Sequence, residues 1–349
     1  MNRVSFLDKL FFTKHLAMML KSGVTVTESI ETIAAQSKSN KFRSILTDVS
    51  NSIRNGQTLA RALALHSKIF DAFYISLVEV GEASGTLDRS LAYLATHLAK
   101  EYELRKKIQG ALLYPMIVLT SVFVVGTGMS FFVLPNLVEL FNSLDTQLPM
   151  TTKILLYFAN IIKEYGIFLI IDFFIFIIAF RILIALPGIK PIWHRVLLSL
   201  PIFGELLQNG ILTTICRNLG MMLKSGLTIT KALIIQYQGT ENLVFKDYMK
   251  RLEIAVDKGK DLHNELTLGN YSKFSPVAIK MIGVGEKTGK LDETFIYLGD
   301  FFEGEVDNLA KNLSVVLEPI ILIVIGVVVG FVALAIITPI YDLTGSIKR

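Results

Sequence analysis

Apolar residues recur along most of this chain with the three-to-four residue spacing of an amphipathic helix. The spacing predicts three helices at the start of the chain, over residues 6–21, 25–35 and 41–54. Gly23 follows the first of them and predicts a left-handed helix end. Thr25 and Glu28 have the spacing of a capping box, which opens the second. Strand patterns are nearly absent, so the sequence predicts an all-α fold.

Two longer helices each carry one apolar seam. The first seam consists of Leu87, Leu91, Leu94, Leu98 and Tyr102. The second consists of Leu291, Phe295, Leu298, Phe302, Val306, Leu309 and Leu313. Such a seam packs against a bundle of the same chain or against a second subunit. Nothing stops the first helix before Pro115, so we expect a long stalk with a kink there and another at Pro319.

Three stretches are apolar enough to predict an integral membrane protein. They lie at residues 116–134, 166–186 and 319–341. The first sits inside a charge-free window, residues 108–138. The second is interrupted by Asp172 and Arg181, which lie toward its ends and within reach of headgroups or a partner helix if the span is centred near Phe176.

This pattern divides the chain into cytoplasmic segments, spans and short connections. The predicted segments are a first cytoplasmic helical repeat with its stalk (1–107), a transmembrane helix (108–138), a short periplasmic loop (139–165), a second transmembrane helix (166–186), a second cytoplasmic repeat with its stalk (187–314), a third transmembrane helix (315–341) and a short tail (342–349). The two large polar segments are repeats of each other, so we expect two repeated helical bundles.

Charge sets the expected orientation. The cations that flank the first two spans on one side are Lys100, Arg105, Lys106, Lys107, Arg181, Lys190 and Arg195. The segment between these spans is poorer in cations, so the positive-inside rule places both bundles and the N-terminus in the cytoplasm and the C-terminus in the periplasm. Lys348 and Arg349 oppose this orientation. No signal peptide is expected, because charges break the first apolar run and no small-residue cleavage site follows.

Composition agrees with a membrane protein and excludes several other classes. The chain has 349 residues, of which 52% are hydrophobic, and its mean hydropathy is +0.53. A net charge of +5 without a basic stripe or an RNA-reading motif gives no case for nucleic acid. Cys216 is the only cysteine, which excludes an internal disulfide and a cysteine zinc cage. The five histidines are scattered without metal-ligand spacing.

The chain repeats itself. Residues 18–30 return as 221–233, and residues 80–94 return as 284–298. Both copies of the second segment contain Gly-Glu-x-x-Gly-x-Leu-Asp, in which the second glycine predicts a helix end and the aspartate a helix start. The copy at residues 283–290 superficially resembles a phosphate loop, but its glycine spacing is wrong and the first copy has Thr86 where the second has Lys290. A corner between two helices is therefore expected.

The glutamate of this motif, Glu82 or Glu286, has several possible roles. It is a shared acid, a cation ligand or a contact for a partner protein, or it satisfies local backbone donors or an ion pair near the turn. The sequence leaves these alternatives open. Asp172 and Arg181 are nine residues apart, on roughly opposite helix faces, and are not expected to pair.

Taken in order, these motifs resemble the inner-membrane platform proteins of type IV pilus and type II secretion machines, the PilC/GspF family. The resemblance rests on Leu20-Lys21-Ser22-Gly23, Gly81-Glu82-x-x-Gly85-x-Leu87-Asp88, Tyr114-Pro115, Leu200-Pro-Ile-Phe-Gly204, Leu223-Lys224-Ser225-Gly226, Gly285-Glu286-x-x-Gly289-x-Leu291-Asp292 and Glu318-Pro319, and on the segments 133–141 and 148–151. It covers almost the whole chain. The chain departs from the family by having Thr25 and Thr228 where a proline often stands, and by a shorter start.

The resemblance implies a scaffold with no enzymatic activity. We predict no cofactor and no metal-ligating residue, and the sequence leaves open whether a metal binds near the Gly-Glu-x-x-Gly-x-Leu-Asp motifs. The partners that the resemblance implies are a cytoplasmic hexameric assembly ATPase, a pilin or pseudopilin, other inner-membrane assembly proteins, further copies of the chain and membrane lipid. The motif residues expected to hold the fold or to contact partners are Lys21, Gly23, Gly81, Glu82, Gly85, Asp88, Pro115, Lys224, Gly226, Gly285, Glu286, Gly289, Asp292 and Pro319.

Two other classes remain open from the sequence. A small transporter or ion-conducting subunit would depend on the two charges of the second span, Asp172 and Arg181. A membrane enzyme would need reactive groups gathered in one pocket. Neither alternative explains the duplication.

Overall fold

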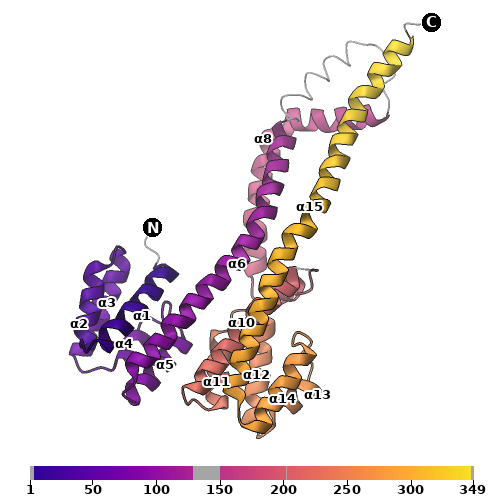
Figure 1. Cartoon of the computed structure of the whole chain (residues 1–349). Helices are drawn as coiled ribbons and strands as arrows, with labels where there is room; N and C mark the ends of the chain where they lie inside the picture. Colours follow the sequence, from indigo (N-terminus) through magenta and orange to yellow (C-terminus); the bar gives the residue numbers. More distant parts are fainter. Residues whose placement is uncertain (1–3, 129–149, 202, 347–349) are drawn as a thin grey trace. The chain divides into compact units, whose positions relative to one another are not determined.

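The computed structural model describes residues 4–128, 150–201 and 203–346 (Figure 1). All regular structure in these ranges is helical, and none of the described residues lies in a strand, so the all-α prediction is confirmed. The chain forms two compact units. One comprises Met1–Ile108 with His194–Asn308, and the other Gln109–Trp193 with Leu309–Arg349.

The first unit contains two series of helices in the same order. The first series is α1 (Phe6–Lys21), α2 (Val26–Gln36), α3 (Asn40–Arg54), α4 (Leu59–Ala64), α5 (Ala72–Ala83) and the start of α6 (Leu87–Gly128). The second series is α10 (Phe203–Lys224), α11 (Ile229–Gly239), α12 (Leu243–Asp257), α13 (Leu262–Leu268), α14 (Pro276–Thr288) and the start of α15 (Leu291–Ser346). The predicted helices over 6–21, 25–35 and 41–54 are confirmed to within one residue at each end.

Short polar side chains begin these helices, and glycines follow their ends. Thr25 accepts a hydrogen bond from the backbone N–H of Glu28, and Thr228 caps α11 in the same way. Only this half of the predicted capping box forms. A complete box occurs instead at Ser5, whose partner Asp8 lies in the first turn of α1. The second bond depends on the rotamer of the acidic side chain, which residue spacing alone does not determine.

The central residues of both apolar seams are buried within the first unit. Leu91, Leu94 and Leu98 from α6 belong to the same hydrophobic core as Phe295, Leu298 and Phe302 from α15. Helix α5 of the first series contacts α10 and α11 of the second. The seams therefore stabilise this unit from inside.

In the second unit the structure differs from the prediction at the connecting loop. Helix α8 spans Met150–Ala185, so the part of the predicted loop from residue 150 on is helical. The sequence contains no proline between Met150 and Leu186 that would interrupt it. Helix α9 (Lys190–Leu197) follows. Helix α6 is continuous through Pro115 and α15 through Pro319, and a kink at either residue stays a prediction.

The helices of the structure and the predicted membrane spans do not coincide in length. Within the described ranges, no helix on its own has the length and apolar character needed to cross a membrane. The segments Ile175–Ala185 and Lys190–Leu197, which are bent by 103° at their junction, meet that test together. The three spans and the segment boundaries stay predictions, and the end of the first span and the start of the connecting loop fall within 129–149, outside the described residues.

Candidate functional site

The two Gly-Glu-x-x-Gly-x-Leu-Asp motifs each form a corner between two helices. Gly85, with φ of +69°, separates α5 from α6, and Gly289, with φ of +70°, separates α14 from α15. A side chain at either position would be strained, which explains the requirement for glycine. Asp88 and Asp292 lie in the first turns of α6 and α15, where a negative charge interacts favourably with the helix dipole. Residues 283–290, which superficially resemble a phosphate loop in sequence, form such a corner.

The motif glutamates bind backbone N–H groups of a neighbouring short helix. Glu82 Oε1 accepts from the N–H of Leu59 at 2.7 Å, and Oε2 accepts from the N–H of Ala60 at 3.1 Å. Glu286 repeats this arrangement in the second series, with distances of 2.6 Å to Leu262 N and 2.9 Å to His263 N. Each carboxylate thus caps the first turn of α4 or α13 with both oxygens. The structure places these side chains in the role of satisfying backbone donors.

The first glycine of each motif permits close packing of the two helices at the corner. A Cβ atom at Gly81 would overlap the side chain of Ser90, and one at Gly285 would overlap that of Thr294. Ser90 and Thr294 occupy matching places in α6 and α15. Both copies therefore bring their corner helices together by omitting a side chain at the same position.

The remaining predicted residues lie apart from these corners. Lys21 and Lys224 are exposed in the last turns of α1 and α10. Gly23 and Gly226 follow with φ of +84° and +90°, as their helix-end role requires. Pro319 is exposed within α15, and Pro115 lies within α6.

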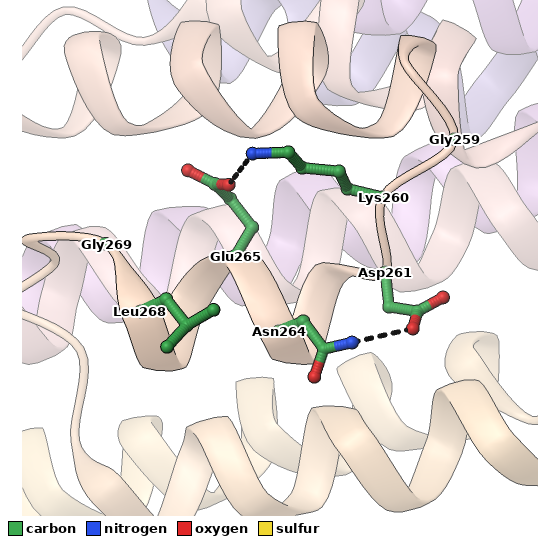
Figure 2. A pocket seen from close by; sticks show the side chains of 7 residues that line it. All are labelled: Gly259, Lys260, Asp261, Asn264, Glu265, Leu268 and Gly269. Atoms are coloured by element: carbon green, nitrogen blue, oxygen red, sulfur yellow. Dashed lines mark hydrogen bonds and ion pairs between the residues drawn. The ribbon is translucent and has the colours of Figure 1, made fainter.

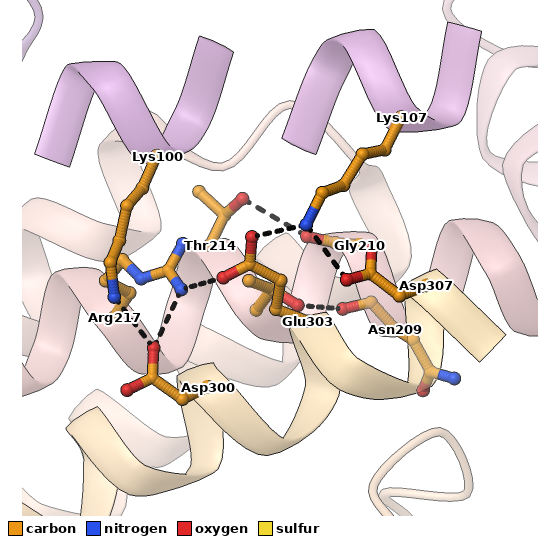
Figure 3. A network of polar contacts seen from close by, with 10 residues as sticks. Lys100, Lys107, Asn209, Gly210, Thr214, Arg217, Asp300, Glu303 and Asp307 are labelled. Atoms are coloured by element: carbon orange, nitrogen blue, oxygen red, sulfur yellow. Dashed lines mark hydrogen bonds and ion pairs between the residues drawn. The ribbon is translucent and has the colours of Figure 1, made fainter. Parts of the chain in front are cut away.

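A second cluster joins the two series, and the sequence did not predict it (Figure 3). Arg217 on α10, whose side chain is 6% exposed, donates to Asp300 at 3.0 Å and to Glu303 at 2.7 Å, both on α15. Lys107 on α6 donates to Glu303 at 3.1 Å and to Asp307 at 3.0 Å. Lys100 on α6 donates to Asp300 at 3.0 Å. We call these residues together the stalk network: Lys100, Lys107, Arg217, Asp300, Glu303 and Asp307.

The pKa shifts of Glu303, Asp300 and Lys107 all favour the charged forms of these side chains. Burial alone would raise the pKa of the Glu303 carboxyl, but hydrogen bonds from Arg217 and Lys107 outweigh it and the pKa is lowered. The pKa of Asp300 is lowered in the same way, with bonds from Lys100 and Arg217 overcoming burial. For Lys107, bonds to the two acids outweigh burial and raise its pKa. At neutral pH the network is ionised and paired, so it holds helices together.

A periodic signal for this network does exist in the sequence. Asp300, Glu303 and Asp307 are three and four residues apart and share one helix face, and Lys100 and Lys107 are seven apart on the other stalk. The acids bound by Lys100 and Lys107 lie 196 to 200 residues away in the chain, and Arg217 lies 83 and 86 residues from Asp300 and Glu303. Charge spacing shows that each face is polar, whereas the pairing itself depends on how the helices pack.

His97 lies buried beside this network without a charge of its own. Its ring centroid is 4.8 Å from that of Phe73, and Nδ1 has no hydrogen-bond partner among the described residues. Burial, assisted by the nearby positive charge of Arg217, lowers the pKa of His97 to about 3. The imidazole is therefore neutral at pH 7. Its Nε2 lies 3.8 Å from a Glu101 oxygen, too far for a hydrogen bond.

An open hollow of about 480 Å³ lies against α13 (Figure 2). Its lining residues are Gly259, Lys260, Asp261, Asn264, Glu265, Leu268 and Gly269. The polar groups bind one another, since Lys260 Nζ lies 3.4 Å from a Glu265 oxygen and Asn264 donates to Asp261 at 2.8 Å. In the described ranges no three His, Cys, Asp or Glu residues are placed to hold a metal ion.

One apolar feature at this hollow recurs in the first series. Leu268 at the end of α13 is 87% exposed, and Leu65, which follows α4 at the matching place, is 68% exposed. The lining charges do not recur, because Gln57, Thr58 and Ala62 stand where the second series has Lys260, Asp261 and Glu265. The exposed leucine is thus the shared surface feature of these two helices.

Comparison with known proteins gives the same duplication. A family model described as "Type II secretion system (T2SS), protein F" matches this chain twice, at residues 12–135 and 215–339. The two matches begin within α1 and α10 and end at comparable points beyond the corner motifs. Both halves of the chain are therefore copies of one family unit.

Similar proteins occur in several bacteria. The chain is 32% identical to the type IV pilus assembly protein PilC of Thermus thermophilus, over 98% of this chain and 84% of the relative. It is 28% identical to PilC of Pseudomonas aeruginosa, over 98% of this chain and 91% of that protein. It is 27% identical to the type II secretion system protein F of the same organism, over 96% of this chain and 82% of the relative. Together with the double match of the family model, these similarities show that the chain belongs to the type II secretion system protein F family, which includes the PilC proteins of type IV pilus assembly.

Proposed function

We propose that this protein is an inner-membrane platform of a type IV pilus or type II secretion machine, which couples a cytoplasmic assembly ATPase to the extraction and polymerisation of pilin or pseudopilin subunits. The observation that carries the proposal is the double family match, together with relatives named for pilus assembly that align over 98% of the chain. In this role the protein is a scaffold and not an enzyme.

The fold of the first unit supports a mechanical role. Glu82 and Glu286 use both carboxylate oxygens to hold helix starts, and the stalk network ties α6 and α15 to α10. These carboxylates and the stalk network thus fix the helices of the first unit relative to one another. A compact unit braced in this way, joined to the predicted membrane helices, would transmit motion generated by a separate ATPase.

Partner contact is assigned to exposed residues that recur in both series. These are Lys21 with Lys224, and Leu65 with Leu268. Exposed residues can be changed with little effect on folding, which separates a contact role from a structural one.

The function is tested by replacing the native gene with variants and scoring pilus assembly or secretion. Loss of the gene is expected to abolish assembly. The double variants Lys21→Glu/Lys224→Glu and Leu65→Ser/Leu268→Ser are expected to reduce assembly and to weaken co-purification of the assembly ATPase with the full-length protein. Lys250→Glu, at an exposed position on α12, is the matched control. Normal assembly after gene deletion contradicts the platform function, and unchanged ATPase binding in both double variants contradicts the contact assignment.

The membrane orientation is tested by labelling introduced cysteines. Cys216 is buried, and burial raises the pKa of its thiol to about 12, so it contributes little background. Exposed Lys38 in the first series and Lys250 in the second are replaced by cysteine in separate variants. Both are expected to be protected from an impermeant maleimide in intact cells, whereas a cysteine at Ser346 is expected to react. Opposite protection of Lys38→Cys and Lys250→Cys contradicts the proposed orientation.

A further inference from the structure

An arginine lies on the apolar surface of α8, close to its end. Arg181 is exposed and forms no ion pair with any residue that the structure describes. Its neighbours on the helix, Ile178 and Ile182, are 58% and 61% exposed. In a helix that enters a bilayer, a guanidinium without an ion-pair partner is costly, and an anionic counter-ion lowers that cost.

An apolar hollow adjoins this arginine. It has a volume of about 480 Å³ and is lined by Ile178, Arg181, Ile182, Ala185, Leu186 and Pro187. Residues 178, 182 and 185 recur at helical spacing, so the lining follows one face of α8. Aliphatic side chains suit an acyl chain, and the only charged group suits a phosphate.

The helix ends beside this hollow in a sharp bend. The segment Lys190–Leu197 is turned by 103° from Ile175–Ala185, so it would run roughly along the surface of a bilayer that α8 enters upright. Trp193 packs edge-on against Phe180, with ring centroids 5.4 Å apart. Tryptophan at such a position is typical of the boundary between hydrocarbon and headgroups.

The local charge favours an anionic lipid over a zwitterionic one. Between residues 173 and 204 the sequence contains the cations Arg181, Lys190 and Arg195 and no Asp or Glu. Each cation near an anionic bilayer contributes about 1 kcal/mol of attraction. A phospholipid whose headgroup carries a net negative charge therefore matches this segment in charge as well as in shape.

We propose that the end of α8 holds an anionic phospholipid, whose headgroup phosphate binds Arg181 and whose acyl chain lies along Ile178 and Ile182. This inference rests on the proposed function, because it requires α8 to enter the membrane. It adds a specific lipid site at the bend that leads into the second helical series. Lys190 and Arg195 supply the further positive charge that selects an anionic headgroup.

Trp193 is the only tryptophan and serves as a reporter beside the site. The full-length protein is reconstituted in phosphatidylcholine vesicles that contain brominated phosphatidylglycerol or, in parallel, brominated phosphatidylcholine. Quenching by the anionic lipid is expected at a several-fold lower content than quenching by the zwitterionic one. Arg181→Gln is expected to reduce this preference about fivefold, which corresponds to the loss of one cation. Arg181→Lys retains the preference, and the exposed Lys250→Gln leaves it unchanged.

The outcomes separate the lipid site from the membrane span. Equal quenching by the two lipids, or an unchanged preference in Arg181→Gln, overturns the lipid site and leaves the span intact. Loss of the preference on addition of inorganic phosphate to the Arg181-containing protein, at constant ionic strength, also overturns it, because the site then binds a free anion. Absence of quenching by either lipid overturns both the site and the membrane insertion on which the proposed function depends.

Discussion

At the scale of single residues, the duplicated glutamates show how a motif can be recognised before its role is known. Glu82 and Glu286 stand in equivalent positions of a conspicuous repeat, which made partner contact and local structure equally reasonable. Their carboxylates bind the starts of helices that precede them by more than twenty residues. A charge used in this way stabilises the fold through hydrogen bonds that no local pattern indicates.

Replacing Glu286 by glutamine is expected to destabilise the protein by about 1–2 kcal/mol, because one of two charge-assisted bonds to α13 becomes a repulsive contact between donors. The midpoint of thermal unfolding in detergent measures the change. Glu293→Gln, at an exposed position in the first turn of α15, is the control. Equal midpoints for the two variants would show that the cap contributes nothing.

His97 predicts a dependence of stability on pH. The folded imidazole has a pKa of about 3, whereas the unfolded one has its ordinary value of 6.5. Below pH 6.5 the unfolded chain binds a proton that the folded protein excludes, so stability falls as pH falls, by about 1.4 kcal/mol per pH unit. The contribution is fully present above pH 6.5 and is lost progressively toward pH 3.

His97→Phe is expected to flatten the decline in stability between pH 6.5 and 5, because the ring no longer titrates. Unfolding midpoints across this range measure the slope. The pKa values of Asp300 and Glu303 are lowered from their ordinary values of 3.8 and 4.5, so these carboxyls titrate below the range from pH 6.5 to 5 and do not obscure the effect of His97. The exposed His15→Gln serves as the control, and an equal slope in His97→Phe and the natural protein would contradict the assignment.

At the scale of helices, the corners depend on two different properties of glycine. Gly85 and Gly289 supply a left-handed backbone conformation, and Gly81 and Gly285 remove a side chain where two helices approach. The first property was predictable from its position after an apolar run. The second was not, because the approach of Ser90 and Thr294 belongs to the packed structure.

Gly285→Ala is expected to destabilise the protein by about 1–3 kcal/mol, because the new methyl group overlaps Thr294. Gly304→Ala provides a matched control in α15, since open space surrounds that position, and is expected to stabilise the helix by about 0.5–1 kcal/mol. Unfolding midpoints of the two variants should therefore shift in opposite directions. A stabilising effect of both alanines would rule out the close approach of α14 and α15.

At the scale of the whole molecule, the described contacts show two copies of one helical series sharing a single core. Leu91 of the first series and Leu298 of the second are both fully buried in it. The stalk network adds ionic contacts between α6, α10 and α15. Although the copies share their order of helices, their charges have diverged, since Thr96 and Ala99 stand where the second copy has Asp300 and Glu303. The duplication thus became asymmetric where the copies meet.

Arg217→Met is expected to destabilise the protein by about 3 kcal/mol, because it leaves Glu303 partly buried with one counter-ion fewer. Lys100→Ala removes a more exposed ion pair of the same network and should cost less than about 1 kcal/mol. A double-mutant cycle of Arg217→Met with Glu303→Gln measures the coupling by thermal unfolding. A coupling near zero, or equal effects of Arg217→Met and Lys100→Ala, would contradict a stabilising role for the buried pair.

The sequence by itself determined the all-α class, the helix ends at Gly23 and Gly289, the duplication and the family, because these depend on residue spacing and local backbone preference. The tertiary structure decided which donors Glu82 and Glu286 bind, which residue Gly285 must avoid, and that Arg217 and Lys107 share Glu303. The physical reason is distance along the chain. Local preferences act over a few residues, whereas these contacts join residues on different helices that meet only when the helices pack together.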